Sequence, residues 1–207
     1  MDQPISSQIV KLASRDRLSS ISVDPVNKVL FYSHIQYWIF IKTTSIISKA
    51  NMDGTGKVVL KKDGMHISAI ANDPWKKVLY FVDLSLKNIQ QINYDGTNQR
   101  VVIAGDSFLI RPISISIFQS YAYIVNQGSA TAVQCKLYGD LECKSFDLNV
   151  LNAARVMVVQ ESQQKQVSNM CDGHKCEIVC VQAELGPKCL CSNGTFTRSG
   201  KCDEVCF

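Results

Sequence analysis

Cysteines are the residues of this chain whose number and spacing allow the most chemistry. There are nine among 207 residues: Cys135 and Cys143 come first, and seven more lie between Cys171 and Cys206. Thiols at this density serve either as disulfide staples or as zinc ligands. Because so short a tail cannot bury enough apolar area to hold itself together, we expect disulfides, which form in oxidising compartments.

Zinc is the alternative for this tail. Its ligands would be one histidine and four cysteines, namely His174, Cys176, Cys180, Cys189 and Cys191. Zinc knuckles favour cysteine pairs with two intervening residues, whereas the pairs here have three and one. The stretch QVSNMC at 166–171 also lacks the acidic residues that a calcium site places before the first cysteine. We therefore expect no metal and no cofactor.

Catalytic motifs find little support in the sequence. GTGK at 54–57 resembles part of a phosphate loop, but that motif requires glycine where Asn51 stands and serine or threonine where Val58 stands. Asp53 and Asp95 each precede a glycine, so we interpret them as turn residues. Paired catalytic carboxylates, a metal-binding histidine pair and a nucleophile elbow are all missing from the sequence. We expect a protein that is not an enzyme.

Histidines and aromatic residues are the remaining candidates for a site. The histidines are His34, His66 and His174. Imidazole titrates between neutral and endosomal pH and could sense acid, but we interpret all three as structural. Tyr37, Trp38 and Phe40 could form an exposed aromatic anchor for a protein partner. We favour the alternative, a strand that packs inward.

An internal repeat determines the elements that must position these residues. NDPWKKVLYFVD at 72–83 repeats VDPVNKVLFYSH at 23–34, with an offset of 49 residues. Each copy has an alternating stretch typical of a half-buried strand, an Asp-Pro turn, and a strand rich in aromatic and β-branched residues. An Asp-Gly pair followed by Val-Val then predicts a tight hairpin, from Asn51 and again from Asn93. Each unit is therefore four antiparallel strands.

A third, weaker copy follows, in which Tyr123 lies 43 residues after Tyr80. Four-stranded antiparallel units at this spacing are typical of β-propeller blades. We predict an all-β fold with blades at about 18–64, 67–109 and 110–160. A leading strand is expected in SSQIVKLAS, and the extra length of the first copy predicts a longer hairpin or an inserted loop after His34.

The number of blades is too small for a closed ring, because a propeller closes with four to eight. An open arc would expose apolar blade faces to water, so we expect about three blades of a probable six, in a fragment of a larger propeller. The cysteine content changes near residue 168. We therefore assign 1–168 to the partial propeller and 169–207 to a small disulfide-rich domain and the start of a further segment.

Composition limits the partners of the chain. With 46% hydrophobic and 19% charged residues the chain resembles a globular protein. Its net charge of +4 is scattered rather than gathered into a basic stripe, so we expect no nucleic acid. The most apolar window, 29–41, is far shorter than the roughly 20 residues that cross a bilayer, so we expect no direct membrane contact from this segment. The N-terminus also lacks a signal-peptide pattern.

The repeats resemble the YWTD propeller of the low-density lipoprotein receptor family, in which the second strand of each blade carries those four letters. The matching positions are Phe31-Tyr32-Ser33-His34, Tyr80-Phe81-Val82-Asp83 and Tyr123-Ile124-Val125-Asn126. The family's aspartate helps to tie neighbouring blades together. The resemblance therefore implies that tie at Asp83, whereas His34 and Asn126 depart from the pattern.

The resemblance continues beyond the repeats. RPISISIFQS from Arg111 resembles the start of the family's last blade, and LNAARVMVVQESQQ at 151–164 resembles its closing strand. In that family an epidermal-growth-factor-like (EGF-like) module follows. Six cysteines permit fifteen pairings. The resemblance implies three of them: Cys171 with Cys180, Cys176 with Cys189, and Cys191 with Cys202.

Three further expectations come from single positions. Cys135 and Cys143 flank KLYGDLE, and a three-residue loop from Tyr138 to Asp140 would place them opposite each other, so we predict a cross-strand disulfide. Cys206 is then left unpaired. Asn193 begins an N-glycosylation sequon, which matters only if the chain enters the secretory pathway.

The resemblance implies a non-enzymatic region of an endocytic receptor that takes up and releases lipoprotein or yolk-type cargo. Its partners would be a protein ligand or lipoprotein and the remaining blades of the full-length chain. Its location would be the extracellular face of the cell surface and the endosomal lumen, as part of a type I membrane protein. The alternatives are a nidogen-like secreted matrix protein and a piece of a growth-factor precursor or receptor kinase.

Overall fold

The protein forms three four-stranded antiparallel sheets followed by a small three-stranded sheet. The computed structural model describes residues 9–37, 43–63, 66–105, 107–149, 153–159, 170–183, 185–191, 195–197 and 201–202. Blade A contains β1 (Arg17–Asp24), β2 (Val29–Tyr37), β3 (Thr43–Asn51) and β4 (Val58–Asp63). Blade B contains β5 (Ile67–Asp73), β6 (Val78–Asp83), β7 (Asn88–Asn93) and β8 (Arg100–Ala104). Blade C contains β9 (Pro112–Phe118), β10 (Tyr121–Asn126), β11 (Thr131–Lys136) and β12 (Cys143–Asp147).

Each blade is a simple up-and-down sheet in which sequential strands pair. The Asp-Pro turns of blades A and B are held by the aspartate, because Asp24 accepts a hydrogen bond from the Asn27 amide and Asp73 accepts from the Trp75 and Lys76 amides. The strands that follow these turns carry the aromatic residues, and every residue of β6 is buried. The observed strand pairing thus confirms the four-stranded unit that the repeat predicts.

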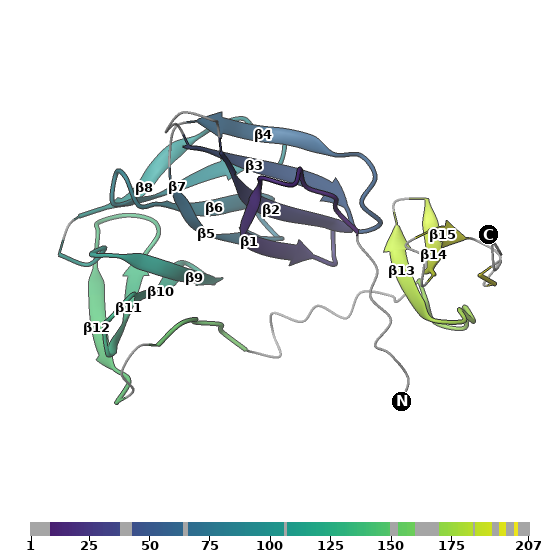
Figure 1. Ribbon diagram of the computed structural model, residues 1–207. Coiled ribbons are helices and arrows are strands. Elements are labelled where there is room, and N and C mark those ends of the chain that lie inside the picture. The colour runs from purple at the N-terminus through teal and green to yellow at the C-terminus, as the bar shows by residue number, and fades with distance from the viewer. Residues whose placement is uncertain are drawn as a thin grey trace.

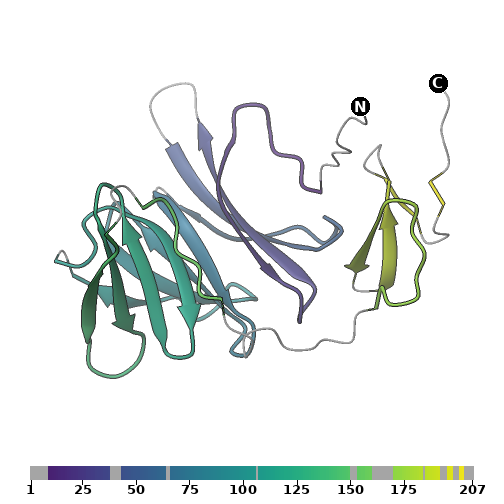
Figure 2. The same cartoon turned by 90° about the horizontal axis from the view of Figure 1, so that it is seen from below.

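The inner strands β1, β5 and β9 lie side by side, so the three blades fan out around them (Figures 1 and 2). Serines join these strands. The Ile70 amide donates to Ser20 Oγ at 3.2 Å, the Asn72 amide to Ser22 Oγ at 3.2 Å, and Ser68 Oγ donates to the Pro112 carbonyl at 2.7 Å. This radial arrangement is that of a partial β-propeller.

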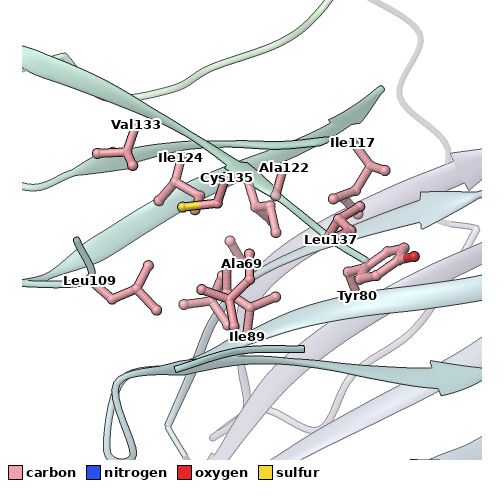
Figure 3. Packing of buried hydrophobic residues seen from close by; sticks show 14 of the residues in the cluster. Ala69, Tyr80, Ile89, Leu109, Ile117, Ala122, Ile124, Val133, Cys135 and Leu137 are labelled. Carbon is pink, nitrogen blue, oxygen red and sulfur yellow. The ribbon is translucent and has the colours of Figure 1, made fainter. Parts of the chain in front are cut away.

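Apolar residues between the blades form the cores. One cluster joins blades A and B, with Phe31 and Ile47 from one and Leu79 and Phe81 from the other. A larger cluster joins blades B and C, where Ala69, Tyr80 and Ile89 meet Leu109, Ile117, Ala122, Ile124, Val133, Cys135 and Leu137 (Figure 3). A third, small cluster covers the far face of blade A, where Val10 and Leu12 pack on Leu30, Tyr32 and Ala50.

The chain segments that flank the blades differ from the prediction. A leading strand was expected in SSQIVKLAS, but its described part, from residue 9, forms no strand. It packs on blade A through the side chains of Val10 and Leu12 instead. Residues 153–159 of the expected closing strand also lack strand pairing. They run along β9, where the Val156 amide donates to Ser114 Oγ and the Val158 amide to Ser116 Oγ, both at 3.1 Å.

Two hairpins also refine the prediction. The extra length of the first copy is a longer hairpin, because β2 and β3 pair over nine residues each. The loop between β11 and β12 is longer than three residues, since it covers 137–142. Leu137 is buried in the core and its amide donates to the Ser120 carbonyl, on the side of β11 that faces away from β12.

The C-terminal module contains β13 (Val179–Ala183), β14 (Gly186–Leu190) and β15 (Phe196–Thr197), which pair in that order. It lies beside blade A rather than beside blade C, although blade C precedes it in the sequence (Figure 1). In the part of the chain that the structure describes, no helix is long and apolar enough to cross a membrane.

Candidate functional site

The first two positions of the blade motif point to opposite neighbours. Phe31 and Tyr80 each face the next blade, and the Phe31 ring lies 4.4 Å from that of Tyr94. Phe81 faces the preceding blade, and Tyr32 lies in the small cluster on the far face of blade A. Because alternate residues of a strand point to opposite faces, an aromatic pair in this position joins three consecutive blades.

In blade C the same alternation leaves Tyr123 on the outward face, because Ile124 points into the core shared with blade B. Tyr123 is half-buried, and its hydroxyl accepts a hydrogen bond from Gln134 Nε2 at 2.8 Å. Tyr123 thus holds the position through which Phe31 and Tyr80 contact a following blade.

The fourth motif position forms a different contact in each blade. Asp83 is fully buried and accepts hydrogen bonds from the Ser85 and Leu86 amides, so it caps its own turn. Asn126 binds the connection between blades B and C, accepting from the Arg111 amide and donating to the Phe108 carbonyl. Asn126 thus ties blade C to the connection that leads from blade B.

His34, the fourth residue of the blade A motif, is 5% exposed and pairs with Asp16. Its Nε2 lies 3.5 Å from Asp16 Oδ2, and its ring stacks on Tyr32. Burial lowers the pKa of His34, Asp16 opposes that shift, and the positive charges of Lys57 and Lys62 add to it. His34 is thus a neutral, structural residue at neutral pH. His66 is exposed, and its carbonyl accepts from the Leu84 amide.

Tyrosine hydroxyls form further ties between blades. Tyr94 of blade B donates to Asp24 Oδ2 of blade A at 2.8 Å. Tyr80 and Tyr138 join blades B and C through their hydroxyl groups, with the Lys76 ammonium 4.0 Å from the centre of the Tyr138 ring. Burial, together with these bonds, raises the pKa of both Tyr80 and Tyr94.

The Asp-Gly turns of blades A and B share one geometry. In each turn the aspartate Oδ1 accepts from both the amide and the hydroxyl of the threonine two residues on: Asp53 binds Thr55, and Asp95 binds Thr97. Gly54 and Gly96 have φ of +80° and +87°, which favours glycine at this point. Instead of a two-residue hairpin, the aspartate side chain organises a connection of six residues. GTGK is thus part of a turn.

Asp53 also joins the C-terminal module to blade A, a contact that the sequence did not reveal. Lys188 of β14 donates from Nζ to Asp53 Oδ2. The side chains of Asp53 and Lys188 are 2% and 21% exposed. Burial alone would raise the pKa of Asp53, but the hydrogen bonds from Lys188 and Thr55 outweigh it and hold that pKa below its usual value.

Four disulfides are present in the described residues. Cys135 and Cys143 face each other across β11 and β12, with their Cα atoms 4.1 Å apart. In the module, the Cα distances are 5.8 Å for Cys171–Cys180, 5.3 Å for Cys176–Cys189 and 5.5 Å for Cys191–Cys202. These are ordinary spacings for bonded cysteines, apart from the closer first pair.

The alternative zinc site does not fit this arrangement. Ligand atoms of His174, Cys176 and Cys189 lie within 4.8 Å of one another. The two cysteines are bonded to each other, however, so neither offers the thiolate that zinc requires.

The concave side of the arc is lined by β1, β5, β9 and residues 155–158, which surround a groove of about 1280 Å³. Trp75 lines it and is 53% exposed. Tyr37 was expected to pack inward, but it is 40% exposed and lies 5.8 Å below the Arg17 guanidinium, because its hairpin extends beyond the core. Trp38, Phe40, Asn193 and Cys206 lie outside the described residues.

No family model matches the chain. Over 202 residues it is 32% identical to the vitellogenin receptor Yl of Drosophila melanogaster, which covers 94% of this chain and 10% of that receptor. It is 27% identical over 192 residues to the vitellogenin receptor of Solenopsis invicta, covering 92% of this chain and 10% of that receptor. The chain thus spans about a tenth of the length of the curated relatives it matches.

Among solved structures, the chain is similar to a luciferin-regenerating enzyme, with a TM-score of 0.53 and 12% identity. The match covers 68% of this chain and 49% of that chain. At such low identity the likeness shows the fold alone.

Proposed function

Because the chain belongs to the low-density lipoprotein receptor family, as a partial YWTD propeller with an EGF-like module, we propose that it is part of the extracellular region of an endocytic receptor for yolk-type cargo. The observation that carries this proposal is the 32% identity to a vitellogenin receptor along 94% of the chain. That match runs through both the blades and the cysteine-rich module, so it concerns their combination rather than one repeat. The role is binding and spatial organisation, without catalysis.

The proposal includes blades beyond the three described here. On β1 of blade A, beyond the part that Val10 and Leu12 cover, Ile21 and Val23 are 55% and 48% exposed. At the other end, Met157 is 77% exposed on the segment that runs along β9. Apolar residues on sheet faces are normally covered, and further blades of the receptor would cover these. We accordingly divide the chain into a propeller region at 1–168 and a module at 169–207.

In this proposal the propeller and its module keep the cargo-binding parts of the receptor in a fixed relation, and the cargo is a lipoprotein or yolk protein. The pair formed by Lys188 and Asp53 supports a rigid unit, because it fixes the module on blade A. The region would then face the exterior of the cell and, after internalisation, the endosomal lumen. Disulfides and the sequon at Asn193 are compatible with that route.

Uptake of yolk protein by oocytes tests the proposal. We expect that females lacking the gene take up fluorescently labelled yolk precursor only at the rate of fluid-phase dextran, and that the full-length gene restores uptake. Replacement of both Cys176 and Cys189 by serine in the full-length gene should abolish the rescue, because the module would lose a staple. Unchanged yolk uptake, with the protein retained in the extracellular matrix, would contradict the proposal.

A further inference from the structure

The contact that holds the C-terminal module uses only one oxygen of one carboxylate. Asp53 Oδ1 is occupied by its own turn, where it accepts from the Thr55 amide at 3.1 Å and from the Thr55 hydroxyl at 2.6 Å. Oδ2 is therefore the only oxygen that Asp53 can offer outward, and Lys188 takes it. The turn of blade A is thus a binding site for a lysine ammonium group, and Lys188 of the same chain occupies it.

The turn of blade B has the same internal hydrogen bonds as the turn of blade A. Asp95 Oδ1 accepts from the Thr97 amide at 2.9 Å and from the Thr97 hydroxyl at 2.6 Å. The amides of Asn51 and Asn93 donate to the carbonyls of the respective threonines, both at 2.9 Å. The side-chain amides of these asparagines also donate to the threonine hydroxyls, both at 3.1 Å. The Asp95 carboxylate is therefore held in the same way as the Asp53 carboxylate.

The surroundings of the two turns correspond as well. A Cβ added to Gly54 would meet the carbonyl oxygen of Ile9, and a Cβ added to Gly96 would meet the carbonyl oxygen of Leu60 at 3.4 Å. In both cases a preceding segment passes close beside the glycine. Blade B therefore reproduces the carboxylate, its turn and the backbone next to it.

The two turns differ in whether a lysine binds their carboxylate. Asp95 is exposed, whereas Asp53 is buried beside Lys188 of the module. Among the residues that the structure describes, none donates to Asp95 Oδ2. The nearby Lys49 donates instead to the Tyr94 carbonyl at 2.9 Å. The bonds from Thr97 lower the pKa of Asp95, and Lys49 adds to this effect, so the carboxylate is ionised at neutral pH.

We propose that the Asp95 turn of blade B is a docking site for a lysine side chain of an extracellular partner protein, equivalent to the site that Asp53 forms for Lys188. A single free oxygen suits an ammonium group, because the guanidinium of arginine is best matched by two oxygens. The partner presents its lysine from a strand, as the module does from β14. This inference concerns one turn and does not depend on the nature of the cargo.

Amide NMR of the whole secreted chain tests the site, with Nα-acetyl-lysine methylamide as the probe. We expect saturable shifts of the Thr97 and Gly96 amides, with an apparent affinity about threefold higher than for the norleucine analogue, since an ion pair at an exposed carboxylate contributes only modestly. The arginine analogue should bind more weakly than the lysine probe. Asp95→Asn should abolish the response at Thr97, and Asp140→Asn, which removes another exposed carboxylate, should leave it unchanged.

The Asp53 turn, which Lys188 occupies, serves as the internal control for lysine binding. In the variant Lys188→Met, the freed Asp53 should capture the probe, and the Thr55 amide should then shift as well. A response at Thr55 in this variant without one at Thr97 would overturn the proposal for Asp95. A response at neither turn would also overturn it, as would an undiminished Thr97 shift in Asp95→Asn. None of these outcomes alters the expected yolk uptake, so the two proposals fail independently.

Discussion

At the scale of single residues, His34 shows how a degenerate motif position acquires a new role. It stands where the family pattern has aspartate, and it is buried against Tyr32 beside the carboxylate of Asp16. Burial makes the charged form unfavourable, so the imidazole acts as a packed neutral ring. This position thus couples the stability of blade A to pH.

The sign of that coupling follows from the lowered pKa of His34. The unfolded histidine takes up a proton near its ordinary pKa of 6.5, whereas the folded one does so only at lower pH. Between these two values the unfolded state holds more protons, so stability falls as pH falls. We expect the free energy of unfolding, measured by urea titration, to decrease as pH drops below 6.5.

Two variants isolate this effect. His34→Phe keeps a ring against Tyr32 and should flatten the pH dependence between neutral pH and about pH 5. His66→Gln changes an exposed histidine and should leave the dependence as it is. Equal slopes in His34→Phe and the unmodified chain would show that His34 is not the titrating group.

At the scale of elements, the turn of blade A and the segment that begins at residue 9 depend on each other. Gly54 has a φ of +80°, and any Cβ there would collide with the Ile9 carbonyl. Gly128 has a similar φ of +75° but no atom within 4 Å of an added Cβ. The two glycines thus share the backbone strain of a substitution and differ in the close approach.

Gly54→Ala and Gly128→Ala therefore form a matched pair. Each should lose about 1–2 kcal/mol for an alanine in the left-handed region. Gly54→Ala should lose more, because Val10 and Leu12 would lose their packing on blade A. Urea unfolding measures the difference, and equal losses would mean that the segment does not rest on the turn.

The blades could be predicted from the sequence because each of their turns and strands has a matching counterpart one repeat away. The Asp-Pro turns, the aromatic strands and the glycines with positive φ all follow from local chemistry that the letters carry. The packing of residues 9–16 could not be predicted in this way, because it depends on the contacts of Val10 and Leu12 with one face of blade A rather than on a local pattern. The contact of Lys188 with Asp53 was also missed, since no local pattern joins residues 135 positions apart.

At the scale of the whole molecule, the ion pair of Lys188 and Asp53 fixes the module on the far end of the arc from the blade that precedes it in sequence. Lys188→Met should leave a nearly buried carboxylate without its partner and cost about 1–3 kcal/mol. Lys175→Met, in an exposed part of the same module, should cost almost nothing.

The same pair of variants tests the rigidity of the assembly. Small-angle X-ray scattering should show a larger radius of gyration for Lys188→Met, because the module would move away from blade A. An unchanged scattering profile would show that other contacts suffice to fix the module. Lys175→Met should scatter like the unmodified chain.

The pairing of the cysteines tests most directly the central claim, that this chain is an extracellular propeller region with an EGF-like module. The measurement is disulfide mapping by mass spectrometry on protein secreted from eukaryotic cells, with free thiols alkylated beforehand. The account predicts the bonds Cys135–Cys143, Cys171–Cys180, Cys176–Cys189 and Cys191–Cys202. Mostly free thiols with stoichiometric bound zinc would contradict it.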